Sequence, residues 1–164
     1  MVKAYVSFGS NIGDREANIR RAIGFLKQRT NLIKTSSIYE TKPMYFENQE
    51  QFLNCVTEID TELKPIELLG FLKNVEKQMG RKEAERNGPR IIDIDILFYG
   101  NHIINENTLA IPHPKIQERA FVLVPFAEIE PNFFHPKLKK NISRLLSELK
   151  YDKSEVKLKS RLRD

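Results

Sequence analysis

The chain has 164 residues, of which 40% are hydrophobic and 30% are charged, a composition typical of a soluble globular domain with its own core. No apolar run approaches the roughly 20 residues that a membrane-spanning helix needs, and the first residues are too mixed for a signal peptide. We therefore expect one domain over residues 1–164, located in the cytoplasm and without a membrane partner.

The net charge of +5 at pH 7 originates at one end of the chain. Residues 137–164 contain 10 Lys and Arg but only 4 Asp and Glu, whereas the rest of the chain has a net charge of −1. Nucleic-acid-binding domains usually carry their basic residues on a face of the core, so no nucleic-acid partner is expected. Residues 150–164 are expected to be a basic, flexible tail that the chemistry does not need.

Strand and helix patterns alternate along the chain. Residues that favour β-structure predict strands over 2–8, 32–41 and 52–60, and a fourth strand that ends at residue 99. Helical spacing of apolar residues predicts one helix that begins after Asp14 and ends near Gln28, and a second from Pro65 to Gly80. The apolar stripe of the second helix is expected at Ile66, Leu69, Leu72 and Met79.

The order strand, helix, strand, strand, helix, strand is that of the ferredoxin-like split βαβ fold. We therefore predict an α+β domain with a mainly antiparallel sheet and helices packed on it. The turn over 9–14 is expected to be an ordinary tight turn, and Cys55 a buried, unreactive thiol. Further on, a short buried helix is expected over 119–126 and an amphipathic segment over 142–149.

Two aspartates, Asp93 and Asp95, interrupt the apolar strand that ends at Tyr99. Because side chains alternate faces along a strand, both carboxylates should point to one side, about 7 Å apart, while the neighbouring isoleucines point to the core. Paired carboxylates suit Mg²⁺, and the arginines that precede them suit phosphate oxygens. The pattern favours phosphoryl transfer, although a solvated strand face with Arg90 paired to one aspartate gives the same sequence.

The block Gly88-Pro89-Arg90, followed by Asp93-Ile94-Asp95 and then by Pro112-His113-Pro114, is highly specific. With it, residues 8–13, 39–41, 52–54 and 119–123 occur in the order and spacing of one family. The chain resembles 6-hydroxymethyl-7,8-dihydropterin pyrophosphokinase, an enzyme of folate synthesis, over roughly residues 2–131.

The resemblance implies an ATP-dependent diphosphotransferase that moves the β,γ-diphosphate of ATP to the hydroxymethyl group of 6-hydroxymethyl-7,8-dihydropterin and releases AMP. Asp93 and Asp95 would hold two Mg²⁺ ions, and Asp95 would also assist loss of the hydroxyl proton. Arg81, Arg86 and Arg90 would neutralise charge on the triphosphate during transfer. The expected partners are ATP and the pterin, bound by a monomer.

The resemblance also implies two sets of binding residues. The ATP set comprises Glu76, Arg86, Arg90, Ile96, Leu109, His113 and Arg119, with Ile96 and Leu109 acting through their backbone. The pterin set comprises Thr41, Pro43, Met44, Phe52, Asn54 and Phe121, with the two phenylalanines stacking on the flat ring.

Three positions depart from the family pattern, and all lie in loops that the resemblance implies close over the substrates. Asn87 stands where the family usually has tryptophan, Glu83 where it often has a second arginine, and Tyr45 where it usually has glycine. These differences concern loop closure and phosphate contacts rather than the metal pair.

Two other functions fit parts of the sequence. Ferredoxin-like domains include RNA-binding modules, but their glycine-aromatic signature is absent here and the core is nearly neutral. A two-metal nuclease or polymerase also uses paired aspartates, but gives no role to the Pro112-His113-Pro114 segment. Conversion of ATP to AMP that depends on pterin and Mg²⁺ would separate the first hypothesis from both.

Overall fold

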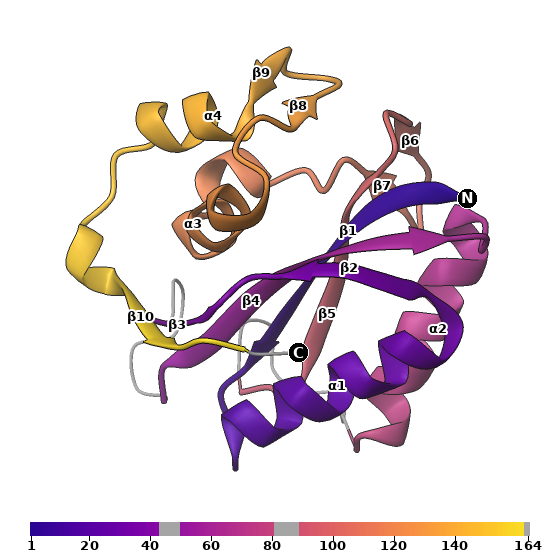
Figure 1. The fold of residues 1–164 in the computed structure, drawn as a ribbon, viewed down its shortest axis with the longest axis horizontal. Helices are drawn as coiled ribbons and strands as arrows, with labels where there is room; N and C mark the ends of the chain where they lie inside the picture. The colour runs from indigo at the N-terminus through magenta and orange to yellow at the C-terminus, as the bar shows by residue number, and fades with distance from the viewer. Residues whose placement is uncertain (43–49, 81–88, 163–164) are drawn as a thin grey trace.

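The computed structural model describes residues 1–42, 50–80 and 89–162, and a six-stranded sheet lies at its centre (Figure 1). The strand order is β10-β3-β4-β1-β5, and β2 also pairs with β4; all these pairs are antiparallel. The α+β, mainly antiparallel prediction is thus confirmed. The strands of this sheet are β1 (Val2–Ser10), β2 (Asn31–Thr35), β3 (Ile38–Thr41), β4 (Phe52–Thr61), β5 (Asp93–Tyr99) and β10 (Val156–Ser160).

Helices cover both faces of the sheet (Figure 1). Helices α1 (Arg15–Arg29) and α2 (Pro65–Gln78) pack on one face, and α3 (Ala120–Ile129) and α4 (Ile142–Glu148) on the other. In the described ranges no helix combines the length and apolar composition that a membrane span requires. The short elements are β6 (Ile104–Asn105), β7 (Ala110–Ile111), η1 (Ile116–Glu118), β8 (Phe134–His135), β9 (Lys140–Asn141) and η2 (Lys153–Glu155).

Local sequence signals set the helix starts. The Asp14 side chain accepts a hydrogen bond from the Ala17 amide at 3.1 Å and caps α1, as predicted. Pro65 occupies the first turn of α2, where its missing N–H costs nothing. The predicted stripe of α2 was wrong at Ile66, which is 53% exposed. The buried face is instead set by Leu68, Leu72, Val75, Glu76 and Met79.

The strand predicted over 32–41 is divided into β2 and β3 by two serines. Ser36 Oγ accepts the hydrogen bond of the Val56 amide at 2.9 Å, so a side chain replaces a ladder carbonyl at this point. Ser37 then donates through both its amide and its hydroxyl to Glu128 of α3. The break therefore attaches the sheet to the helix that covers it.

An aromatic cluster fills the layer between the sheet and α3. Phe98 of β5 is fully buried, and its ring lies 4.6 Å from Phe133, 5.6 Å from Phe126 and 6.4 Å from Tyr5, measured between centroids. Tyr5 stacks on Phe126 at 4.6 Å. These rings bury a large apolar area in specific edge and offset geometries, and they hold α3 on the sheet.

Cys55 lies at the centre of the molecule, in β4 opposite Phe8 of β1. Its side chain is 0% exposed, and burial raises the pKa of the thiol well above its usual range. The predicted buried, unreactive thiol is confirmed, because the nucleophilic form of cysteine is the thiolate.

The C-terminal segment, expected to be flexible, contributes strand β10 to the edge of the sheet. β10 pairs with β3, with Val156 opposite Thr41 and Leu158 opposite Tyr39. The Lys42 amide donates to the carbonyl of Glu155 at 3.2 Å, and Ser160 Oγ donates to Glu16 at 2.6 Å. The structure therefore differs from the sequence prediction, since residues 156–160 are tied to β3 and α1.

Deletion of residues 151–164 is expected to lower the thermal midpoint by roughly 5–10 °C, because several hydrogen bonds, at about 1 kcal/mol each, and an edge strand are lost from a chain of this size. Turnover at temperatures where the shortened protein is folded should stay within a few-fold of the intact protein. Calorimetry and an activity assay at 15 °C check the two parts. An unchanged midpoint would show that β10 contributes no stability.

Candidate active site

Strand register places the predicted metal and pterin residues on one face of the sheet. Gly9 of β1 pairs with Asn54 of β4 on one side and with Asp93 of β5 on the other. Directly paired residues in antiparallel strands point to the same face, so Asn54 and Asp93 share a face. By alternation the same face carries Asp95, Phe52 and Thr41, and it is opposite the face covered by α1 and α2.

The two aspartates are half-buried and alternate with core isoleucines, as the sequence predicted. Ile94, between them, is 7% exposed and faces the other side. The Ile94 amide donates to Glu76 Oε2 of α2 at 2.8 Å, and Glu76 is itself only 6% exposed. Glu76 therefore anchors the backbone between the two carboxylates to α2; its assignment to ATP binding stays a prediction.

Gly9 keeps the centre of this face open. A Cβ atom at residue 9 would lie 2.9 Å from Asn54 Oδ1 and 3.5 Å from Phe52 Cδ1, and the first of these distances is shorter than packed side chains permit. The absence of a side chain at Gly9 therefore lets Asn54 approach β1. It also leaves space on the strand that separates Asn54 from Asp93.

His113 and Arg119 lie at the edge of the face next to Asp93. Burial, and then the nearby Arg119 guanidinium, lower the pKa of His113 to about 4, partly offset by Asp93. His113 Nδ1 accepts a hydrogen bond from the Lys115 amide at 3.2 Å. At neutral pH the imidazole is therefore neutral with its proton on Nε2, which makes that atom a hydrogen-bond donor.

Arg119 has the features of an anion-binding side chain. Its Nε is buried and has no hydrogen-bond partner in the described part of the chain, which is costly unless a ligand supplies an acceptor. The guanidinium lies over the ring of Phe121, with Cζ 5.5 Å from the ring centroid. Arg119 is thus oriented by the aromatic residue assigned to the pterin, and its fork suits phosphate oxygens.

The pterin residues that the structure describes lie on the same side of the sheet. Asn54 Nδ2 donates to Thr41 Oγ1 at 2.6 Å, and these side chains are 7% and 2% exposed. Phe52 is half-buried beside them on β4, and Phe121 is half-buried at the start of α3, which covers the same face. These residues supply two aromatic rings and a fixed amide, which are the parts that a flat heterocycle with polar edges requires.

The backbone of Ile96 and Leu109, predicted to bind ATP, lies at the outer edge of β5 and in the turn beyond it. Ile94 directs its amide away from β1, toward Glu76, so Ile96, two residues on, has the same orientation. The carbonyl of Leu97 accepts from the His113 amide at 3.0 Å, which attaches the His113 segment to this edge. Leu109 exchanges backbone hydrogen bonds with Glu106 in the adjoining turn.

Several predicted residues cannot be placed. Arg81 and Arg86 of the catalytic set, and Pro43 and Met44 of the pterin set, lie outside the described residues. The same holds for the three positions that depart from the family pattern, Tyr45, Glu83 and Asn87.

The aspartate pair fits a Mg²⁺ site in which the substrate supplies part of the coordination. Within residues 1–42, 50–80 and 89–162, no group of three or more histidine, cysteine, aspartate or glutamate side chains is arranged to hold a metal ion. Mg²⁺ is commonly bound by one or two carboxylates, with water and substrate phosphates completing its coordination. Asp93 and Asp95 would supply these two carboxylates.

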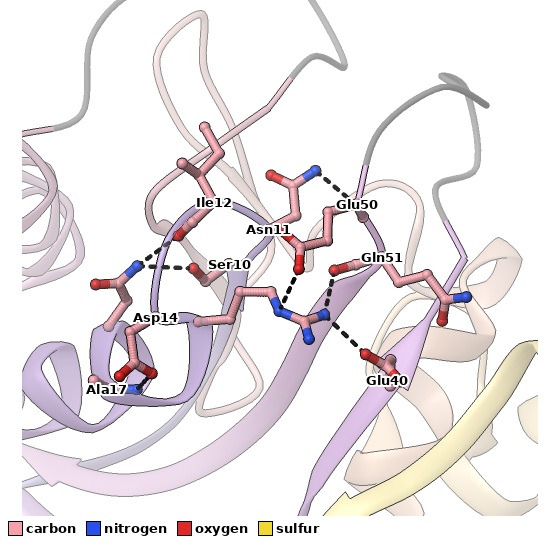
Figure 2. Close-up of polar contacts among 10 residues, drawn as sticks. Ser10, Asn11, Ile12, Asp14, Ala17, Glu40, Glu50 and Gln51 are labelled. Carbon is pink, nitrogen blue, oxygen red and sulfur yellow. Dashed lines mark hydrogen bonds and ion pairs between the residues drawn. The ribbon is translucent and has the colours of Figure 1, made fainter.

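Sequence reasoning missed a polar network at the end of β1 (Figure 2). Asn11, only 2% exposed, hydrogen-bonds to the chain before β4 and to the chain before β5. Arg15 of α1 binds Glu40 at 2.9 Å and the carbonyl of Gln51 at 2.8 Å. The one available signal was the asparagine in the Gly9-Ser10-Asn11 motif. The predicted tight turn over 9–14 begins later than expected, because β1 continues through Ser10.

Comparisons with known proteins agree on one family. The family model for 7,8-dihydro-6-hydroxymethylpterin-pyrophosphokinase matches residues 5–131. Over 148 residues the chain is 45% identical to 2-amino-4-hydroxy-6-hydroxymethyldihydropteridine pyrophosphokinase of Aquifex aeolicus, covering 90% of this chain and 92% of that protein. The corresponding protein of Bacillus subtilis is 48% identical over 128 residues, covering 77% of each chain.

Longer proteins contain the same domain. The folic acid synthesis protein FOL1 of Dictyostelium discoideum is 46% identical over 141 residues, which is 86% of this chain but 22% of that protein. The chain thus spans about a fifth of that relative. A crystal structure of wild-type HPPK-DHPS from Plasmodium falciparum superimposes with a TM-score of 0.72 over 90% of this chain and 44% of that one. At 17% identity this match shows a shared fold.

Proposed function

The chain belongs to the 7,8-dihydro-6-hydroxymethylpterin-pyrophosphokinase family, and we propose that it performs the reaction of that family, a step of folate biosynthesis. It transfers the diphosphate of ATP to the hydroxymethyl group of 6-hydroxymethyl-7,8-dihydropterin and releases AMP. One structural observation supports this function most directly. Gly9 of β1 pairs with both the pterin candidate Asn54 of β4 and the metal candidate Asp93 of β5. The two candidates therefore lie on one face of the sheet, on the strands that flank β1.

The reaction joins the pterin hydroxyl oxygen to the β-phosphorus of ATP. The bond from that phosphorus to the oxygen shared with the α-phosphate breaks, and AMP leaves with that oxygen. When bound, Mg²⁺ neutralises phosphate charge and helps the hydroxyl lose its proton. Asp93 and Asp95, which share one face of the sheet, would hold two such ions from the protein side, and Asp95 would assist removal of the hydroxyl proton.

The remaining residues divide between the two substrates. His113 Nε2–H and Arg119 donate to triphosphate oxygens, and Arg90, with Arg81 and Arg86, neutralises the charge that develops during transfer. The backbone of Ile96 and Leu109 and the side chain of Glu76 are assigned to the nucleoside. Phe52 and Phe121 stack on the pterin, while Asn54 and Thr41, with Pro43 and Met44, bind its edge.

A coupled assay tests this function directly. AMP production from ATP is expected only when 6-hydroxymethyl-7,8-dihydropterin and Mg²⁺ are both present, and EDTA should abolish it. ATP hydrolysis that is independent of pterin would contradict the proposal. The same protein should show no salt-dependent binding to RNA, which the alternative RNA-binding function requires.

The unit that carries this function is a single domain over residues 1–164. The inclusion of residues 156–160 in the main sheet supports this boundary. We assign the enzyme to the cytoplasm, where its single cysteine stays reduced, and expect it to act as a monomer. No nucleic acid or membrane takes part in the proposed reaction.

A further inference from the structure

The side chain of Asn11 hydrogen-bonds to the chain before β4 at Glu50 (Figure 2), and it also hydrogen-bonds to the chain before β5 at Arg90. β1 ends at Ser10, so Asn11 comes directly after the strand that separates β4 from β5. Its side-chain amide has a donor nitrogen, Nδ2, and an acceptor oxygen, Oδ1, and these two atoms bind different neighbours. Asn11 itself is only 2% exposed, so its side chain has little access to water and would be costly to leave without these partners.

On the β5 side, Asn11 continues the pairing of β1 beyond its last ladder residue. The backbone N–H of Asn11 donates to the carbonyl of Arg90 at 3.0 Å, and the backbone N–H of Arg90 donates to the side-chain Oδ1 of Asn11 at 2.7 Å. This reciprocal pair fixes the backbone of Arg90, three residues before Asp93. It therefore sets where β5 begins and where the Arg90 side chain leaves the backbone.

On the β4 side, Asn11 Nδ2 donates to the carbonyl of Glu50 at 3.2 Å. Arg15 binds the next carbonyl, that of Gln51, at 2.8 Å, and forms a 3.6 Å ion pair with the Glu50 carboxylate. These contacts fix the chain just before Phe52, the first residue of β4. Asn11 is thus hydrogen-bonded to the segment before β4 and to the segment before β5. Arg15, in contrast, contacts the segment before β4 and Glu40 of β3.

We infer that Asn11 is a positioning residue for diphosphate transfer, which holds the Phe52–Asn54 half of the site and the Arg90–Asp95 half at a fixed separation. In-line attack requires the pterin hydroxyl oxygen and the β-phosphorus to be held about 3–3.5 Å apart and aligned, and a misplacement of about 1 Å reduces the rate about a hundredfold. The inference rests on the proposed function, because only a reaction between two substrates requires both halves to be held in register.

Asn11→Ala removes both side-chain links and creates no new charge. We expect kcat for AMP formation to fall about ten- to a hundredfold, with a raised KM for the pterin. Binding of a non-hydrolysable ATP analogue in the absence of pterin should weaken by no more than a few-fold, because that ligand engages the β5 half alone. A residue that only stabilised the fold would instead lower the fraction of active enzyme, while the folded molecules kept the parental pterin KM and the parental affinity for the analogue.

One-sided variants separate the two links. Asn11→Asp keeps the acceptor for the Arg90 amide but loses the donor to Glu50, and Arg15→Met removes contacts on the β4 side only. Both should raise the pterin KM, with a smaller loss of kcat than in Asn11→Ala. Asn18→Ala is the matched control: Asn18 Nδ2 binds Ser10 Oγ and the Ile12 carbonyl within the same turn. It should behave like the parent protein.

Hydrogen exchange at the Arg90 amide provides a readout that does not depend on activity. This amide should be protected in the parent and in Asn11→Asp, and should exchange about tenfold faster or more in Asn11→Ala. Parental kcat and pterin KM in a folded Asn11→Ala protein would overturn the inference, as would an unchanged exchange rate. If the parent protein itself makes no AMP, the proposed function fails, while the exchange result still tests the link to Arg90.

Discussion

Replacing Asp95 with asparagine is expected to reduce AMP production by about three orders of magnitude or more, while the protein stays folded. Asparagine keeps the shape of the side chain on β5 and removes only its charge. Removal of one preorganised electrostatic group from an active site costs about a hundred- to a thousandfold in rate, and loss of a metal carboxylate adds weaker Mg²⁺ binding. Steady-state AMP formation, measured over a range of Mg²⁺ concentrations, gives the size of the effect.

Asp60→Asn is a matched control for this substitution. Asp60 lies near the other end of the sheet, on β4 opposite Lys3, and its loss should change turnover by less than twofold. Thermal midpoints of both variants, measured with and without an ATP analogue and Mg²⁺, separate folding from chemistry. The analogue should raise the midpoint of Asp60→Asn and of the parent more than that of Asp95→Asn. Near-parental AMP production by a folded Asp95→Asn protein would rule out the metal role.

Phe98→Ala is expected to lower the free energy of unfolding by about 3–5 kcal/mol, the usual cost of removing a fully buried phenylalanine. Phe98 is 0% exposed and contacts aromatic rings from β1, α3 and the segment before β8. A cavity at this position would loosen α3, whose first turn carries Phe121. Since a whole domain is stable by only about 5–15 kcal/mol, denaturant unfolding should detect the change easily.

Phe134→Ala makes the same chemical change at a neighbouring position that is 53% exposed. It should cost less than about 1 kcal/mol, because little apolar surface returns to water. A loss in Phe98→Ala as small as that in Phe134→Ala would mean that the aromatic cluster collapses to fill the cavity.

Features with a strong local signal were predicted from the sequence. Asp14 and Pro65 mark helix starts through their own side chains, and alternation places Asp93 and Asp95 on the face opposite Ile94, whatever the rest of the chain does. The topology could be predicted from the order of the strands and helices. Short connections exclude most arrangements of two helices on a four-stranded sheet.

Features that depend on distant partners were missed. The Val156-Lys157-Leu158-Lys159 segment alternates apolar and basic residues, a pattern typical of a protected edge strand, but its net charge suggested a flexible tail. Only the presence of the β3 edge makes it a strand. Asn11 gave no signal of its role because its partners, Glu50 and Arg90, are 39 and 79 residues away. On α2, the position of the sheet determines that Leu68 is buried and Ile66 is exposed.

Because the single thiol lies buried at the centre of the sheet, the rate at which it is chemically labelled measures how often the native state opens. Cys55 reacts with an alkylating reagent only after the core between the sheet and helices α1 and α2 opens far enough to expose and ionise the thiol. The labelling rate in excess reagent therefore counts these openings without denaturant. Substrates that bind the native state stabilise it against such opening and will therefore slow the labelling. A mass spectrometer can thus follow ligand binding through an atom that no substrate touches.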